Sequence, residues 1–207
     1  MKEVELSPDK VLVKESGTNS EEISAKNIII ATGSSPVVLK GLPHDKKSVL
    51  TSDDILELEE IPSSLLIIGG GSVGLEFAYV YKTLGCRVTV IEVMDKILPT
   101  NDKDVASALR KSLSKKGINF RTQTELKYIE IIEGAVETTI KKNDENAKIL
   151  ESEKVLLAMG RKPETDDIGL DNLNLEYNGR YINVDENLQT NQPGIYAIGD
   201  VTGPPLL

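Results

Sequence analysis

The sequence predicts an α/β fold built on a parallel sheet, with an antiparallel meander inserted into it. Over residues 65–121, short apolar runs alternate with segments of helical periodicity, which is the pattern of parallel strands joined by helices. Over residues 125–158, three strand-like runs are separated by turn residues, as in antiparallel strands. The chain has 207 residues, of which 39% are hydrophobic and 28% charged, as expected for a soluble globular protein.

The first part of the chain contributes two predicted strands and a short helix. Residues 11–13 and the isoleucine-rich residues 27–33 are apolar, and the second run ends at a Gly-Ser-Ser-Pro turn. Residues 52–54 offer an N-cap for a helix through Leu58, which Pro62 ends.

The most regular segment is a strand, a glycine turn and a helix. Residues 65–68 form a short apolar run, residues 69–74 read Gly-Gly-Gly-Ser-Val-Gly, and Gly85 provides a C-cap. The apolar residues at helical spacing between them are Val73, Phe77, Val80, Tyr81 and Leu84. Residues 87–92, dense in β-branched side chains, predict the next strand.

A second helix and a third strand complete the parallel unit. Asp102 is a candidate N-cap, and the expected inward stripe consists of Val105, Leu109 and Leu113. Residues 118–121 then predict a strand, and strand–helix–strand–helix–strand at this spacing indicates a right-handed parallel arrangement. The remaining predicted strands are residues 125–132, 136–142, 148–158, 181–184 and 194–200.

The glycine turn has the composition of a Rossmann-like dinucleotide-binding site. A helix N-terminus offers backbone N–H groups and partial positive charge to a pyrophosphate. Gly69 permits the tight turn, Gly71 leaves room for the phosphates, and Gly74 allows close packing of helix and strand. The candidate cofactor-binding residues here are Gly69, Gly71, Ser72, Val73 and Gly74.

Glu92 ends the second strand, eighteen residues after Gly74, at the spacing expected for an acid that binds the adenosine ribose. A carboxylate there accepts hydrogen bonds from both ribose hydroxyls but repels a 2′-phosphate, so NAD is favoured over NADP. The alternative is that Glu92 is a solvated acid at a strand end.

Charge and composition exclude several other classes of function. The net charge of −9 argues against nucleic acid or an anionic membrane as the main partner. No apolar run is long enough for a signal peptide or a membrane span, so a cytoplasmic location is expected. Cys86 is the only cysteine and is expected to be a small buried apolar residue, and no metal site is predicted. His44 is expected to be a solvated loop residue.

Four separated segments together resemble the flavin-dependent pyridine nucleotide disulfide oxidoreductases. They occur in the family's order, at residues 30–34, 69–76, 158–163 and 195–201. The resemblance covers essentially the whole chain but less than half of such an enzyme. Residues 203–206 are more similar to the branch that oxidises dihydrolipoamide than to the glutathione or mercuric branches.

The resemblance implies a role for each matched residue. Gly69, Gly71, Gly74 and Glu92 would hold NAD, and Gly160 would lie near the nicotinamide. Thr32, Gly33 and Asp200 would contact FAD, and Glu76 matches the family acid that pairs with a lysine beside the flavin. Plain structural alternatives remain for each: Gly33 and Gly160 end strands, Asp200 starts a turn, and Glu76 complements the helix dipole on its first turn.

The chain also departs from the family pattern. The first FAD-binding glycine turn, the redox cysteine pair, the catalytic His-Glu pair and the lysine partner of Glu76 have no counterpart in it. Glu164 stands where an asparagine is common. With its apolar last residues, the chain is expected to be truncated, with no catalytic residues of its own and an incomplete FAD site.

These observations give a domain assignment and a functional hypothesis. Residues 1–50 are expected to be a remnant of an FAD-binding domain, residues 51–184 an NAD-binding domain, and residues 185–207 a return segment of the FAD-binding domain. The parent would oxidise dihydrolipoamide through a disulfide and FAD, with hydride transfer to NAD. Its implied partners are the rest of the enzyme, a dimer partner and the lipoyl domain of a 2-oxoacid dehydrogenase complex. Alternatives are a related flavin-dependent disulfide reductase, an NADH oxidase, or a stand-alone nucleotide-binding module.

Overall fold

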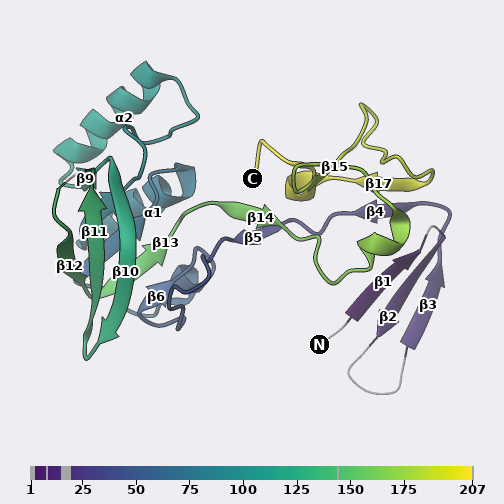
Figure 1. Cartoon of the computed structure of the whole chain (residues 1–207), viewed down its shortest axis with the longest axis horizontal. Helices are drawn as coiled ribbons and strands as arrows, with labels where there is room; N and C mark the ends of the chain where they lie inside the picture. Colours follow the sequence, from purple (N-terminus) through teal and green to yellow (C-terminus); the bar gives the residue numbers. More distant parts are fainter. Residues whose placement is uncertain (1–2, 8, 15–19, 144, 207) are drawn as a thin grey trace. The chain divides into compact units, whose positions relative to one another are not determined.

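The computed structural model describes residues 3–7, 9–14, 20–143 and 145–206 and divides the chain into two compact units. The central unit is Pro36–Gly160, and the flanking unit combines Met1–Ser35 with Arg161–Leu207 (Figure 1). Neither α-helix in the described part of the chain is long and apolar enough to cross a bilayer.

These units differ from the expected boundaries at 50/51 and 184/185. Residues 36–50 belong to the central unit because their strand β6 (Val49–Leu50) pairs with β13 (Lys154–Leu157). Residues 161–184 belong to the flanking unit because Leu170, Leu173 and Ile182 are buried in its hydrophobic cluster. Packing partners distant in sequence set both boundaries.

A parallel sheet forms the centre of the central unit, as predicted, but it has five strands instead of the three expected. Its order is β6-β13-β7-β8-β9, where β7 is Ser64–Ile68, β8 is Arg87–Ile91 and β9 is Asn119–Arg121. Helix α1 (Ser72–Thr83) connects β7 to β8, and α2 (Lys103–Lys115) connects β8 to β9. The α/β fold class is therefore confirmed.

Both faces of this sheet are covered, which explains why its strands are continuously apolar. Successive side chains of a strand point to opposite faces. Leu65 and Ile67 share a buried cluster with residues of α1 and α2, whereas Leu66 and Ile68 pack with residues of the meander. The helices and the meander thus cover opposite faces of the sheet (Figure 1).

The two helices bury part of the expected stripes: Tyr81 of α1 and Leu113 of α2 are buried, as predicted, but other members of the stripes are exposed. Helix α1 turns Leu75, Ala78 and Tyr81 inward, while Val80 and Leu84 are 48% and 52% exposed. In α2, Ala106 and Leu113 are buried, but Val105 is 56% exposed. The expected stripes followed the larger apolar side chains and left out the small residues Ala78 and Ala106, which are buried. The predicted cap is confirmed, since Asp102 accepts hydrogen bonds from the N–H groups of Asp104 and Val105.

The antiparallel meander has the order β10-β11-β12, with β10 at Thr124–Ile132, β11 at Ala135–Lys142 and β12 at Lys148–Ser152. The single strand expected over residues 148–158 is wrong, because the chain leaves β12 and enters β13 of the parallel sheet. Glu153 forms the corner: its carboxylate accepts from the N–H and Oγ–H of Ser63, each at 2.8 Å, and its N–H donates to Ser64 Oγ. These bonds tie the corner to the start of β7.

The flanking unit contains short strands in four sheets, one of three strands and three of two strands. β1 (Glu3–Ser7), β2 (Lys10–Lys14) and β3 (Ser20–Ser24) form an antiparallel sheet, of which residues 11–13 were predicted. β4 (Ile28–Ile30) lies parallel to β17 (Ile195–Ala197), within the ranges expected. The remaining elements are β5 (Ser34–Pro36) paired with β14 (Arg161–Pro163), β15 (Tyr177–Asn178) paired with β16 (Tyr181–Ile182), and the 3-10 turns η2 (Leu170–Leu173) and η3 (Gly199–Thr202).

The short helix expected before Pro62 is a 3-10 turn, η1 (Asp54–Glu57), held by a polar network that includes His44. His44 is partly buried, and its Nε2 atom lies 2.6 Å from Oδ2 of Asp54, so the expectation of a solvated loop residue is wrong. Thr51 donates both its N–H and its hydroxyl to the same oxygen. Burial would raise the pKa of Asp54, but the hydrogen bonds from Thr51 and His44 outweigh it and hold this pKa at about 2.

Acid should therefore weaken the central unit through Asp54. Its folded-state pKa lies below the ordinary 3.8, so the charged carboxylate stabilises the fold above about pH 4, and this contribution disappears as the pH falls toward 2. We expect up to about 2 kcal/mol from this group. Urea unfolding of the wild type and of Asp54→Asn, measured from pH 7 to pH 2, should give curves that converge at low pH. Glu57→Gln, an exposed change in the same turn, is the control, and parallel wild-type and Asp54→Asn curves would contradict the assignment.

Candidate dinucleotide-binding site

The glycine turn joins β7 to α1 at the carboxyl edge of the parallel sheet, and two of its glycines are required by close backbone contacts. Gly69 has φ of 117°, and a Cβ there would lie 2.2 Å from the carbonyl oxygen of Ala158. A Cβ on Gly74 would lie 2.3 Å from the carbonyl oxygen of Gly69. Both distances are far below van der Waals contact, so Gly69 and Gly74 allow β7, α1 and the residues after β13 to pack together.

Gly71 differs from the other two because no atom of the described residues would contact a side chain at this position. It is the N-cap of α1 with an ordinary extended backbone, φ −75° and ψ −179°, and a Cβ built on it meets nothing within 4 Å. As a glycine, it presents no side chain to the N–H groups of the first helical turn. The helical hydrogen bonds begin at the N–H of Leu75, which donates to the carbonyl of Gly71 at 3.0 Å. The absent side chain therefore leaves open space at a helix N-terminus, as an incoming anion requires.

Glu92 lies against this turn and is 8% exposed. Its Oε2 atom accepts the N–H of Gly70 at 2.7 Å, and its Oε1 atom accepts the N–H of Met94 at 2.9 Å. The alternative of a solvated strand-end acid is therefore wrong. A carboxylate oxygen has more than one lone pair, so each oxygen retains capacity for a further donor.

Backbone hydrogen bonds hold the turn on both sides. The N–H of Gly69 donates to Ile91 at 2.9 Å, and the carbonyl of Gly70 accepts from Leu98 at 2.8 Å. Together with the Glu92 carboxylate, these bonds connect the turn to the end of β8 and to the segment that follows it. The turn is thus a preorganised part of the sheet edge.

The other central-unit candidates occupy different surroundings. Ser72 is exposed and Val73 is partly buried at the start of α1. Glu76 is exposed and lies beyond the first turn, because α1 begins at Ser72, so the expectation that it complements the dipole there is wrong. Gly160 has φ of 117° with nothing within 4 Å of a built Cβ, and it follows Ala158, which contacts Gly69. The carboxyl ends of β7, β8 and β13 thus carry the turn, Glu92 and the segment leading to Gly160.

The flanking-unit candidates also gather after parallel strands. Thr32 and Gly33 follow β4, and Asp200 follows β17, its parallel neighbour. Thr32 Oγ1 donates to the carbonyl of Glu164 at 2.6 Å, and the N–H of Glu164 donates to Gly33. Asp200 is 9% exposed and accepts from Ser34 Oγ at 2.5 Å. The acid is therefore the buried member of a partly buried polar network.

Two members of that network, Ser34 and Arg161, were not predicted as site residues. Arg161 Nε donates to Ser34 Oγ at 2.7 Å and lies 4.0 Å from the Asp200 carboxylate, and a second guanidinium nitrogen donates to the Ser34 carbonyl. Both residues stand within segments that carry the family resemblance. Their position directly after the candidate residues Gly33 and Gly160 could have identified them as site residues from the sequence.

Cys86 is buried, as predicted, with 1% of its surface exposed. Burial raises the pKa of its thiol to about 11, so the reactive thiolate is scarce at neutral pH. In the described part of the chain, no group of three or more His, Cys, Asp or Glu side chains is placed to hold a metal ion.

Comparison with known proteins matches the chain to a known family. The family described as pyridine nucleotide-disulphide oxidoreductase matches residues 2–207. Dihydrolipoyl dehydrogenase of Chlamydia pneumoniae is 43% identical over 196 residues, covering 94% of this chain and 41% of that protein. Dihydrolipoyl dehydrogenase of Bacillus subtilis is 40% identical over 188 residues, covering 90% of this chain and 40% of that protein.

A solved structure shows the same fold. The Cu(II) complex of the HOCl-induced flavoprotein disulfide reductase RclA from Escherichia coli superimposes with a TM-score of 0.86 at 30% identity, covering 99% of this chain and 46% of that one. The chain thus spans less than half the length of these three relatives. The match to the family over residues 2–207 shows that the chain belongs to the pyridine nucleotide-disulphide oxidoreductases.

Proposed function

We propose that the central unit binds NAD, with the pyrophosphate over Gly71 and the N-terminus of α1. The observation that carries this proposal is the contrast among the three glycines. Close contacts within the protein explain why residues 69 and 74 are glycines, whereas among the described residues no contact explains the glycine at residue 71. The glycine at residue 71 is explained if phosphate groups must reach the backbone N–H groups at this position. Ser72 and Val73 would offer their N–H groups, and Gly160 would lie near the nicotinamide.

Glu92 would accept hydrogen bonds from the adenosine ribose, using the lone pairs that Gly70 and Met94 leave free. The same carboxylate disfavours a 2′-phosphate through charge repulsion. Residues 93–95 read Val-Met-Asp and add no positive charge. We therefore propose NAD rather than NADP as the nucleotide.

The flanking unit would contribute part of an FAD site. Thr32, Gly33 and Asp200 follow the parallel strands β4 and β17, and ligands of parallel sheets bind beyond the carboxyl ends of strands. The network of Asp200, Ser34 and Arg161 gives this edge a fixed polar surface that fits the sugar and phosphate part of a dinucleotide. No partner for Glu76 is assigned.

The whole protein is proposed to be a dihydrolipoyl dehydrogenase, as the names of its curated relatives suggest. Electrons would pass from a dithiol through a disulfide and FAD to NAD, in a dimer that serves the lipoyl domain of a 2-oxoacid dehydrogenase complex. The chain contributes a nucleotide-binding portion to this reaction. Its one cysteine is buried with a raised pKa, so the chain itself is proposed to be inactive.

A related flavoprotein disulfide reductase is the second candidate, because RclA shares the fold at 30% identity. The two candidates differ in their sulfur substrate. A dihydrolipoyl dehydrogenase takes electrons from a dithiol to the flavin, whereas a disulfide reductase passes electrons from the flavin to a disulfide. Assaying the whole protein with dihydrolipoamide and NAD separates them: turnover supports the first, and its absence alongside NADH-dependent reduction of another disulfide supports the second.

Gly71→Thr is the sharpest test of the nucleotide site. Threonine suits an N-cap with extended backbone, so the free energy of unfolding should be unchanged or slightly raised. The new side chain should project into the space proposed for the pyrophosphate and weaken NAD binding about tenfold or more. Isothermal titration calorimetry with NAD and thermal unfolding measure the two effects. Unchanged NAD affinity in the folded variant would refute the proposed placement of the pyrophosphate.

A further inference from the structure

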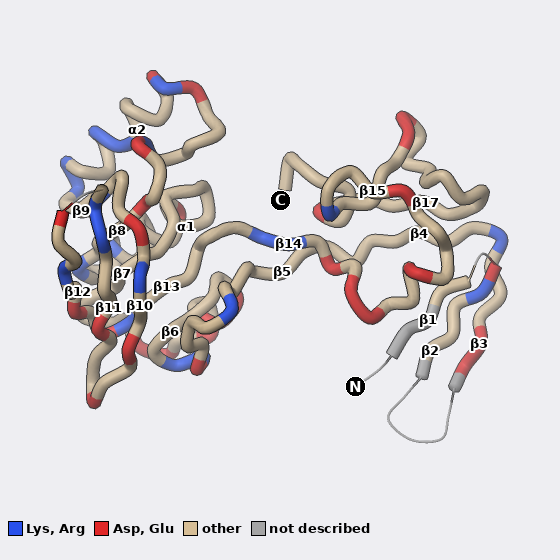
Figure 2. The backbone as a smooth tube through the Cα atoms, in the orientation of Figure 1, with Lys and Arg blue, Asp and Glu red and all other residues tan. Residues whose placement is uncertain are grey.

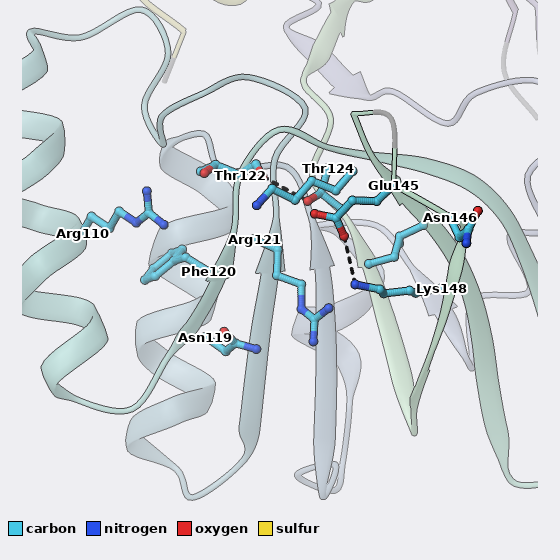
Figure 3. A pocket seen from close by; sticks show the side chains of 11 residues that line it. Arg110, Asn119, Phe120, Arg121, Thr122, Thr124, Glu145, Asn146 and Lys148 are labelled. Atoms are coloured by element: carbon cyan, nitrogen blue, oxygen red, sulfur yellow. Dashed lines mark hydrogen bonds and ion pairs between the residues drawn. The ribbon is translucent and has the colours of Figure 1, made fainter.

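The central unit has a polar cavity of about 330 Å³ beside β9 (Figure 3). It is bordered by α2, by β9 and by the ends of β11 and β12. None of its lining residues belongs to the glycine turn, and Glu92 is not among them. It is therefore a separate candidate site.

Four cationic side chains from four elements line this cavity: Arg110 of α2, Arg121 of β9, Lys142 of β11 and Lys148 of β12. Figure 3 shows Arg110, Arg121 and Lys148 around the opening, with Glu145 joined to Lys148. That ion pair measures 2.9 Å, and Glu145 is the only carboxylate among the lining residues that the structure describes. The described lining thus carries three more cationic groups than carboxylates.

This concentration of positive charge is unusual for the chain that contains it. Lys and Arg total 24 against 33 Asp and Glu. Acidic and basic residues are otherwise interspersed along the central unit (Figure 2). Like charges gathered around one cavity repel one another, and a bound anion would offset that repulsion.

The chemistry of the lining indicates phosphate groups. Guanidinium groups bind phosphate oxygens in bidentate geometry, and the cavity provides two of them on different elements. Asn119, Asn146 and Thr122 add neutral hydrogen-bonding groups. The volume is at the lower end of the range for small-molecule sites and exceeds what one simple ion requires. A peptide ligand is disfavoured, because β9 has three residues and is short for pairing with an added peptide strand.

We propose that this cavity binds the diphosphate group of a phosphorylated small molecule, independently of the NAD site. The two sites share a backbone connection, because the N–H of Glu92 donates to Arg121 and the N–H of Thr124 donates to Glu92, both at 2.9 Å. Substituting Arg121 could therefore disturb the nucleotide site. Arg110 and Lys142 are the better positions for a test.

The experiment is a titration of the ¹⁵N-labelled protein with inorganic pyrophosphate at constant ionic strength, followed through backbone amide shifts. Arg110→Glu and Lys142→Glu each place a negative charge in the lining. The matched controls are Lys111→Glu and Lys141→Glu, which make the same change one residue away and outside the lining. Gly71→Thr tests whether pyrophosphate binds to this cavity independently of the glycine turn.

We expect saturable shifts in residues 119–124 and 145–148, with affinity lowered about tenfold or more by each lining variant. The control variants should lower it less than about threefold, and Gly71→Thr should leave these shifts unchanged. The proposal is overturned if the shifts are confined to residues 69–74, if they do not saturate, or if lining and control variants weaken binding equally. The last result would indicate only general attraction to positive charge.

Discussion

Replacing Gly69 with alanine is expected to lower the free energy of unfolding by about 3 kcal/mol or more. A Cβ at this position would overlap the carbonyl oxygen of Ala158 at 2.2 Å, and φ of 117° is unfavourable for any L-side chain. The overlapping atom belongs to the backbone directly after β13, whose hydrogen bond from the N–H of Ala158 to Ile68 would have to shift as well. Urea unfolding with linear extrapolation measures the loss.

Gly160→Ala is the matched control, because Gly160 has the same φ of 117° but no atom within 4 Å of a built Cβ. Its free energy of unfolding should fall by about 1–2 kcal/mol, which is the cost of the positive φ alone. The difference between the two variants therefore isolates the backbone overlap. Equal losses for Gly69→Ala and Gly160→Ala would mean that the close approach to Ala158 does not matter for stability.

Much of the central unit could be predicted because its signals are local. The apolar run at residues 65–68, the glycines after it and the Asp102 cap each depend on neighbours within a few residues. The observed β7, glycine turn and α2 N-terminus follow these expectations. The parallel arrangement then follows from the chirality of strand–helix–strand connections.

The parts that could not be predicted depend on contacts between residues distant in sequence. The split between β12 and β13 occurs where Glu153 bonds to Ser63 and Ser64, about ninety residues earlier. The unit boundaries and the inward face of α1 are likewise set by packing partners that periodicity does not name. For the site, spacing located Glu92 near the turn but gave no indication that its carboxylate bonds to Gly70.

That bond gives Glu92 a structural role besides the proposed ligand role, and the roles predict different results for Glu92→Ala. Removing the carboxylate leaves the N–H groups of Gly70 and Met94 without their acceptor beside a largely buried site. We expect the free energy of unfolding to fall by about 2–4 kcal/mol, since each buried unsatisfied donor costs about 1–3 kcal/mol. A residue that only binds the ribose would lower NAD affinity and leave unfolding unchanged.

Glu92→Gln separates the two roles further. Its amide oxygen can still accept one N–H, while its NH₂ group faces the other donor, so the loss of stability should lie between those of wild type and Glu92→Ala. The glutamine also removes the negative charge that repels a 2′-phosphate, so the preference for NAD over NADP should shrink in calorimetric titrations of this variant. Glu76→Gln makes the same charge change at an exposed position on α1 and should alter neither quantity. If Glu92→Gln keeps the full preference for NAD, other residues discriminate between NAD and NADP, and Glu92 only stabilises the glycine turn.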